Sequence, residues 1–225
     1  KNAIPILSTV KISVTSEGIT LTGSNGQISI EHYISTQDEN AGLLISSPGS
    51  ILLEAGFFIN VVSSMPDLVL DFAEIEQKQI VLTSGKSEIT LKGKDSEQYP
   101  RLQEVPTSKP LILETSTLRQ TINETAFAAS TQESRPILTG VHFVLTEHKN
   151  LKTVATDSHR MSQRKLELDT SGDDFDVVIP SRSLREFTAV FTDDIETVEV
   201  LFSNNQILFR SESISFYTRL LEGTY

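Results

Sequence analysis

The stretch RPILTGVHFVL at residues 135–145 repeats the stretch IPILSTVKISV at residues 4–14, with Pro136 aligned to Pro5, 131 residues apart. Two further pairs of stretches align with similar spacing, and the small drift in spacing is what short loop insertions produce. They are VATDSHRMS (154–162) with LTGSNGQIS (21–29), and residues 206–225 with residues 79–100. The sequence therefore predicts two tandem copies of one β-rich domain.

The stretch QEVPTSKP at 103–110 holds two prolines and few apolar residues, which is typical of a domain boundary. We predict a first domain over 1–104 and a second over 105–225. In the second copy a strand near Leu111–Leu113 and a helix over 116–130 precede the PIL segment, whereas the first copy starts at Lys1. We therefore expect the first domain to lack its N-terminal strand and helix, and the chain to be a fragment.

Most of the chain has the period-2 alternation of strands. In VKISVT (10–15), Val10, Ile12 and Val14 fall on one face, and residues 18–34 hold two such runs around a Gly-Ser-Asn-Gly turn. Both PIL segments are interpreted as strands that continue these runs. Few helices interrupt the hairpins, so the pattern predicts an α+β fold with antiparallel sheets.

Three stretches have helical periodicity, at 53–65, 116–130 and 182–191. The first places Phe58, Val61, Val62 and Met65 on one stripe, and Pro66 ends it. The expected stripe of the second helix is Leu118, Ile122, Ala126 and Ala129; that of the third is Leu184, Phe187 and Phe191. Thr115 or Ser116 is the candidate N-cap of the second helix and Ser181 that of the third.

The composition is that of a globular protein, with 38% hydrophobic and 22% charged residues among 225. No 18-residue apolar run and no signal peptide is visible, and cysteine is absent, which together favour a cytoplasmic location. The net charge of −11 argues against a protein that grips nucleic acid with a strongly basic surface. It still allows a local basic strip.

Asp157, Ser158 and His159 stand side by side in VATDSHRMSQR (154–164) and are the three residue types of a serine hydrolase triad. In an extended segment, however, neighbouring side chains point to opposite faces, and no G-x-S-x-G elbow surrounds the serine. A hairpin turn in which Asp157 binds local N–H groups is another interpretation. A hydrolase using Ser158 and a β-rich adhesin or ligand-binding module remain alternatives. The histidines lack metal-site spacing, so we expect no metal and no cofactor.

The segments PIL, TVATDSHRM, IPSRSL and LLEGTY resemble the bacterial DNA polymerase III beta subunit family, the replication sliding clamps. The resemblance covers the whole chain. It implies tandem clamp domains with antiparallel sheets outside and paired helices on an inner concave face, and a ring homodimer of three-domain subunits around duplex DNA. We expect the third domain to be missing from this piece, which would then not close a ring. The family role is that of a non-catalytic processivity factor.

The resemblance also implies a pocket that binds short peptide motifs of the DNA polymerase III alpha subunit, the clamp loader and repair polymerases. Leu138 and Met161 would form an adaptable apolar floor, Arg135 and Arg160 would hold peptide carbonyls or a carboxylate, and His159 would be a hydrogen-bonding wall. Many relatives have Gly in place of Ser158 and Leu in place of Met161. The full expected set is Arg135, Leu138, Thr156, Ser158, His159, Arg160 and Met161.

Contact with DNA is implied to be weak, since a ring holds its duplex by enclosing it. The residues expected to face the DNA are Lys1, Gln132 in the loop after helix 116–130, and Arg182 and Arg185 on the third helix. The first helix carries Gly56 and Ser63-Ser64 where relatives are often basic. We therefore expect a small slope of log affinity against log salt.

Overall fold

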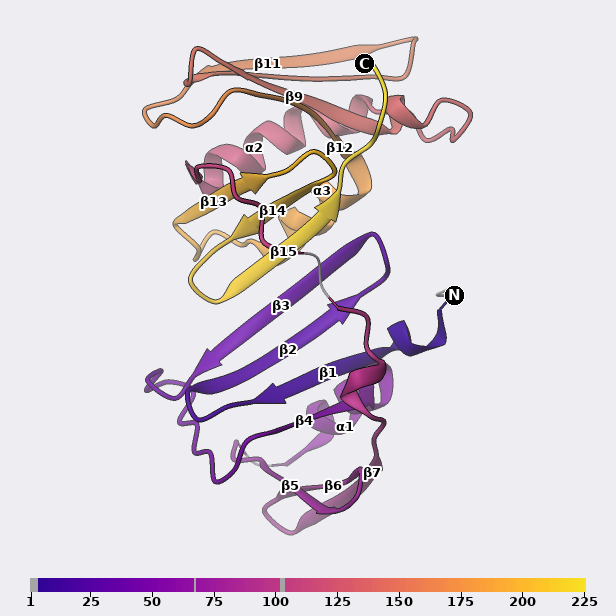
Figure 1. Ribbon diagram of the computed structural model, residues 1–225, viewed down its shortest axis with the longest axis vertical. Coiled ribbons are helices and arrows are strands. Elements are labelled where there is room, and N and C mark those ends of the chain that lie inside the picture. Colours follow the sequence, from indigo (N-terminus) through magenta and orange to yellow (C-terminus); the bar gives the residue numbers. More distant parts are fainter. Residues whose placement is uncertain (1–3, 67, 102–103) are drawn as a thin grey trace. The chain divides into compact units, whose positions relative to one another are not determined.

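The computed structural model describes residues 4–66, 68–101 and 104–225. The chain divides into two compact units, Lys1–Gln103 and Glu104–Tyr225, and each is described by itself (Figure 1). None of the helices in the described ranges is long and apolar enough to cross a membrane.

The described residues of the first unit form two antiparallel sheets, one α-helix and two short 3₁₀ helices. One sheet has the strand order β4-β1-β2-β3, and the other has the order β5-β6-β7. Helix α1 follows β4 directly. The elements are η1 (Pro5–Ser8), β1 (Thr9–Val14), β2 (Gly18–Ser24), β3 (Ile28–Ser35), β4 (Gly49–Glu54), α1 (Ala55–Ser64), β5 (Asp71–Glu76), β6 (Gln79–Ser84), β7 (Ser87–Lys92) and η2 (Ser96–Gln98).

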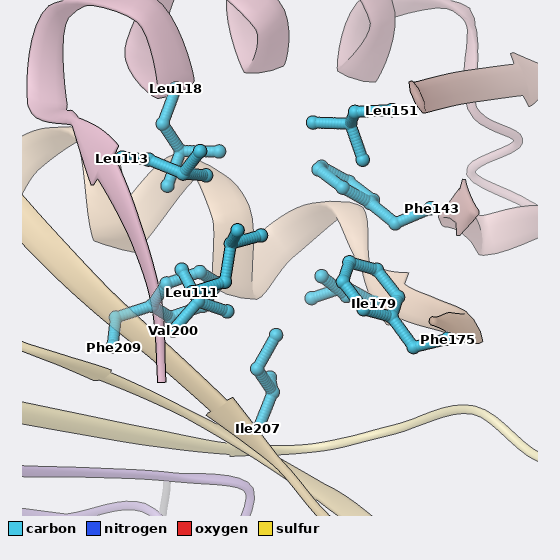
Figure 2. A pocket seen from close by; sticks show the side chains of 10 residues that line it. All are labelled: Leu111, Leu113, Leu118, Phe143, Leu151, Phe175, Ile179, Val200, Ile207 and Phe209. Carbon is cyan, nitrogen blue, oxygen red and sulfur yellow. The ribbon is translucent and has the colours of Figure 1, made fainter. Parts of the chain in front are cut away.

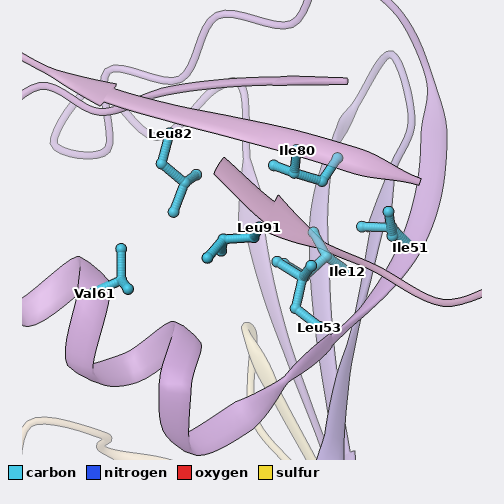
Figure 3. Packing of buried hydrophobic residues seen from close by; sticks show 7 residues of the cluster. All are labelled: Ile12, Ile51, Leu53, Val61, Ile80, Leu82 and Leu91. Atoms are coloured by element: carbon cyan, nitrogen blue, oxygen red, sulfur yellow. The ribbon is translucent and has the colours of Figure 1, made fainter. Parts of the chain in front are cut away.

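The core of the first unit lies between the sheets and α1, as Figure 3 shows. Val10 and Val14 pack on it beside buried Ile12, so the predicted alternation is confirmed. From α1 only Val61 is fully buried, with Phe58 packed against the same cluster. The prediction that Val62 belongs to the buried stripe is wrong, because this short helix packs along one narrow line and leaves Val62 exposed.

The second unit repeats this plan. Its first sheet has the order β12-β9-β10-β11, which matches β4-β1-β2-β3, and β13-β14-β15 matches β5-β6-β7, with β8 added beside β13. The predicted repeat is confirmed. The elements are β8 (Leu111–Glu114), α2 (Thr115–Thr125), η3 (Ala126–Ala128), η4 (Pro136–Thr139), β9 (Gly140–Thr146), β10 (Asn150–Thr156), β11 (Met161–Glu167), β12 (Phe175–Pro180), α3 (Ser181–Val190), β13 (Thr197–Phe202), β14 (Gln206–Arg210) and β15 (Ile214–Arg219).

The three predicted helices exist, but the N-caps predicted for the second and third are wrong. The N-caps of α2 and α3 are Glu114 and Pro180, and neither makes a side-chain cap hydrogen bond. Thr115 and Ser181 are instead buried first residues of the helices, and Ser116 is also helical. Each helix leaves a strand without a loop, so the last strand residue makes the change from extended to helical backbone.

The PIL segments are short 3₁₀ helices, η1 and η4, and the interpretation of them as strands is wrong. Proline occupies the first helical turn in both, where its fixed φ is favourable. In both copies a hydroxyl then turns back to the proline carbonyl: Ser8 Oγ lies 2.8 Å from Pro5 O, and Thr139 Oγ1 lies 2.6 Å from Pro136 O. The β-strands begin only after these turns.

The second unit has an aromatic core around α3. The Phe187 ring is fully buried, and its centroid lies 4.5 Å from that of Phe191 and 4.6 Å from that of Phe209. Close by, side chains of both sheets and Leu118 of α2 line an apolar cavity of about 10 Å³ (Figure 2). This is room for about one water-sized sphere, and the lining offers no polar partner to hold a water there.

Helices α2 and α3 lie against each other, and the Arg119 guanidinium of α2 donates to the carbonyl that follows α3, at Phe191. The second unit therefore has the predicted helix pair. The placement of sheets outside and helices on an inner concave face concerns the two units together and stays a prediction.

Candidate functional site

The hairpin between β10 and β11 carries five of the seven predicted pocket residues. Its tip, residues 156–161, is a tight turn. Thr156 and Met161 are paired across the strands, and Thr156 Oγ1 donates to the Arg160 carbonyl at 2.7 Å and accepts from the Ser158 N–H at 3.1 Å. Ser158 has φ +75°, in the left-handed region. We call residues 156–161 the hairpin tip.

Asp157 organises the hairpin tip. Its Oδ1 accepts from the backbone N–H groups of His159 and Arg160, both at 3.0 Å, and its Oδ2 accepts from Arg160 Nε at 3.0 Å. This is an Asx-type turn, in which a side-chain oxygen replaces a backbone carbonyl. The backbone hydrogen bonds from His159 and Arg160 favour the ionised carboxylate and lower the pKa of Asp157.

The hairpin tip has no triad geometry. The prediction that residues 157–159 form an extended segment is wrong, because Ser158 adopts a left-handed turn conformation. The interpretation as a hairpin turn describes the local geometry. Both Asp157 oxygens are engaged by the turn, and the described hydrogen bonds include none between the side chains of Ser158 and His159. A hydrolase using Ser158 is therefore not supported.

Arg160 fastens the hairpin tip to the end of α2. Its Nη2 donates to the Phe127 carbonyl at 3.0 Å, and its guanidinium carbon lies 5.8 Å from the centroid of the Phe127 ring. Phe127, in η3, is still 56% exposed. An exposed aromatic ring under an arginine can receive an apolar side chain, so Phe127 joins the candidate site. The sequence analysis missed it, although its place off the predicted α2 stripe was a usable signal.

The remaining predicted pocket residues divide between two elements. His159 and Met161 are exposed at the hairpin tip, Met161 by 67%. Arg135 precedes η4 and is exposed, and Leu138 is half-buried within η4, which packs on β9. No hydrogen bond of the described residues joins η4 to the hairpin tip. The pocket residues thus form two groups, and the structure does not by itself join them into one closed pocket.

The chain end adds one residue that the sequence analysis missed. The Tyr225 hydroxyl accepts from the Thr156 N–H at 2.9 Å, and its ring stacks on that of His142 with centroids 5.0 Å apart. His142 Nε2 lies 2.6 Å from Asp176 Oδ1. Burial raises the pKa of Tyr225, so the hydroxyl stays protonated at neutral pH. LLEGTY offered no local pattern that would have paired Tyr225 with Thr156.

The predicted DNA-facing residues are only partly described. Lys1 lies outside the described residues. Gln132 is exposed in the turn after η3, and its N–H donates to Ser130 Oγ at 3.0 Å. Arg182 and Arg185 are exposed, one turn apart on the outer side of α3, and neither takes part in an ion pair of the described part of the chain. Two unpaired cations on one helix face can meet phosphates.

Within the described ranges, no group of three or more His, Cys, Asp or Glu side chains is placed to hold a metal ion. The chemistry of the hairpin tip is that of recognition: exposed apolar groups, a cation and backbone groups, with no nucleophile held by a base.

Two family models together match almost the whole chain. The DNA polymerase III beta subunit N-terminal domain matches residues 1–103, and the central domain of the same subunit matches residues 112–225. The β-rich adhesin alternative is not supported by these matches.

Named relatives agree with the family models. The chain is 81% identical over 225 residues to the beta sliding clamp of Streptococcus pneumoniae and 37% identical over 227 residues to that of Bacillus subtilis. Each alignment includes 100% of this chain but only 60% of the relative, so the chain spans about three fifths of the relatives' length.

Solved structures share the fold. The crystal structure of the DNA polymerase III beta chain from S. pneumoniae superimposes with a TM-score of 0.98 at 81% identity, covering 100% of this chain and 60% of that one. The beta subunit from the DNA polymerase of Streptococcus pyogenes gives 0.96 at 72% identity, covering 100% and 59%.

Proposed function

This chain belongs to the DNA polymerase III beta subunit family, and on that premise we propose that it is part of a replication sliding clamp. In this proposal the full-length protein acts in the cytoplasm as a ring homodimer that encloses duplex DNA and keeps the polymerase on its template. The observation that carries the proposal is the match of two consecutive beta-subunit domains along almost the whole chain, with a TM-score of 0.98 to a solved beta chain.

The proposed role is that of a binding platform without catalysis. The geometry of the hairpin tip supports this role, because Asp157 is committed to the turn and Arg160 to the end of α2. Neither side chain is free to act as an acid or base. What remains exposed, chiefly Phe127 and Met161, suits the capture of an apolar anchor residue.

We further propose that the hairpin tip receives short motifs of the Gln-x-x-Leu-Phe type from the alpha subunit, the clamp loader and repair polymerases. A flexible, exposed Met accepts Leu or Phe anchors from several partners. Arg135, just before η4, and Leu138 within it would form the other side of the pocket. The Ser158 hydroxyl and the His159 ring would offer side-chain hydrogen bonds to the peptide, and Thr156 would hold the turn that presents them.

Titration of the ¹⁵N-labelled chain with the peptide Gln-Ser-Ser-Leu-Phe tests this pocket. We expect the amide signals of Thr156–Met161 to shift, together with that of Leu138, while signals of the first unit stay in place. The peptide Gln-Ser-Ser-Ala-Ala is the matched control and should leave all signals unmoved. Equal shifts from both peptides, or none from either at millimolar concentration, would contradict the pocket.

A further inference from the structure

The C-terminal segment, residues 220–225, runs back from β15 along the first sheet of the second unit (Figure 1). The Leu221 N–H donates to the Val178 carbonyl at 2.9 Å, which forms an isolated antiparallel bridge to β12. Tyr225 then stacks on His142 of β9 and reaches Thr156 of β10. The segment therefore touches three neighbouring strands of one sheet.

Two glycines make this path possible. Gly140 leaves the room that Leu221 occupies, because a Cβ at position 140 would lie 2.8 Å from Leu221 Cδ1 and 2.8 Å from the Ile179 carbonyl oxygen. Gly223 has φ +127°, a conformation that side-chain-bearing residues rarely adopt. The turn at Gly223 beside Ile137 of η4 directs the chain toward His142.

Tyr225 contacts β10 just beyond the point where its pairing with β9 ends. The pairing of β9 with β10 stops at His142 and Val154, whereas β10 continues to Thr156. The Thr156 N–H thus lies beyond the last residue of β10 that pairs with β9, and the Tyr225 hydroxyl accepts a hydrogen bond from it at 2.9 Å. The Tyr225 ring stacks on His142, the last residue of β9 that pairs with β10, and Nε2 of the His142 ring lies 2.6 Å from Asp176 Oδ1.

We propose that Tyr225 is a positioning residue for the hairpin tip: its hydroxyl replaces the missing strand partner of Thr156 and fixes residues 156–161 for peptide binding. The second part rests on the proposed function. The Thr156 hydroxyl is the acceptor for Ser158 N–H and the donor to the Arg160 carbonyl, so an anchored Thr156 backbone restrains the whole turn. The same segment passes Ile137 of η4 at Gly223 and reaches Thr156 at Tyr225, so it contacts both elements that carry predicted pocket residues.

The test compares Tyr225→Phe with Tyr33→Phe in the 225-residue chain. Both changes remove one tyrosine hydroxyl that makes a 2.9 Å hydrogen bond, and the control hydroxyl binds the Glu17 carbonyl in the first unit. Tyr225→Phe keeps an aromatic ring on His142, so folding is preserved. We expect the Thr156 amide to exchange with deuterium roughly three- to tenfold faster in Tyr225→Phe, the loss of one net hydrogen bond. Tyr33→Phe should leave it unchanged.

Affinity for the Gln-Ser-Ser-Leu-Phe peptide, measured by fluorescence anisotropy, should fall several-fold in Tyr225→Phe, while the melting temperature falls by no more than about 4 °C and the chain stays folded at the assay temperature. His142→Ala keeps the hydroxyl but removes the ring beneath it, and it should reproduce part of both effects. Unchanged Thr156 exchange in both variants overturns the proposal. Faster Thr156 exchange in Tyr225→Phe, combined with a peptide affinity equal to that of the wild type, also overturns the proposal.

Failure of the wild-type chain to bind the peptide would instead count against the proposed function. Tyr225 is then judged by Thr156 exchange alone, a measurement that needs no peptide. Faster exchange in Tyr225→Phe supports its positioning role in that case too.

Discussion

The Arg160 guanidinium lies over the Phe127 ring at 5.8 Å and binds the carbonyl of the same residue, so one side chain ties a β-hairpin to the end of a helix. These residues are 33 positions apart in the chain. Arg160 was expected to be a free ligand for a peptide. Its position shows that much of its hydrogen-bonding capacity holds the site together.

Arg160→Ala should therefore lower stability as well as peptide affinity. The loss of an exposed cation–π contact and of two hydrogen bonds, to Asp157 and to the Phe127 carbonyl, amounts to only about 1–2 kcal/mol in the free energy of unfolding, because the side chain is still largely in water. Urea unfolding followed by circular dichroism measures it. Lys165→Ala, an exposed charge on the same hairpin, should change stability by less than about 0.5 kcal/mol. If both variants change the free energy of unfolding equally, Arg160 does not hold the hairpin tip to the end of α2.

Ser158→Gly should stabilise the chain. Ser158 holds φ +75°, and a residue with a side chain is disfavoured in this region by about 1 kcal/mol relative to glycine. We expect the melting temperature to rise by a few degrees. Gln163→Gly, in the extended β11, should lower it, because glycine weakens a strand. Destabilisation by both changes would mean that the hairpin tip does not adopt this turn in solution.

The architecture of both units was predictable because it depends on local periodicity and on the repeat. Val10, Ile12 and Val14 alternate as the sheet requires, and the aligned stretches became equivalent strands. The N-caps were not predictable in this way. Capping rules assume a loop before the helix, whereas Glu114 and Pro180 are the last residues of strands.

The candidate site was only half accessible to sequence reasoning. The alignment of residues 154–162 with the Gly-Ser-Asn-Gly turn already contained the information that residues 157–159 form a turn, and the argument from alternating faces overrode it. Phe127 and Tyr225 were missed for a different reason. Their partners lie 33 and 69 residues away, and no local pattern in one sequence encodes such pairings.

The order of the hairpin tip should depend on acid pH through Asp157. Its pKa is lowered from 3.8 in the folded chain, chiefly by the N–H groups of His159 and Arg160. The folded state therefore favours the ionised carboxylate. The contribution of the ionised Asp157 carboxylate to the stability of the folded chain is complete above about pH 5. It decreases as the pH falls through and below 3.8. The ¹⁵N shifts of His159 and Arg160 should titrate below pH 3.8 and become pH-independent in Asp157→Asn. A midpoint above 3.8 contradicts this.

Phe187→Ala should be among the most damaging substitutions in the second unit. The ring has no exposed surface and stacks with Phe191 and Phe209, and truncation of a buried Phe costs about 3–5 kcal/mol. The second unit is expected to lose cooperative thermal unfolding or to melt well below the wild type in calorimetry. Phe127→Ala, the same change at a ring that is 56% exposed, should cost less than about 1 kcal/mol. If Phe187→Ala lowers the melting temperature only slightly, the Phe187 cluster is not the core of the second unit.

The double variant Arg182→Ala/Arg185→Ala should weaken DNA contact. Both cations are exposed on α3 without an ion pair among the described residues, so each is free to displace one counterion from a phosphate. Anisotropy of a labelled duplex between 50 and 200 mM salt should give a shallow slope of log affinity against log salt, and the double variant should reduce that slope by about 2. Lys152→Ala/Lys165→Ala removes the same charge from the β10–β11 hairpin and should leave the slope in place. If the two double variants change the slope equally, DNA contact depends on surface cations in general, and α3 has no special role in facing the DNA.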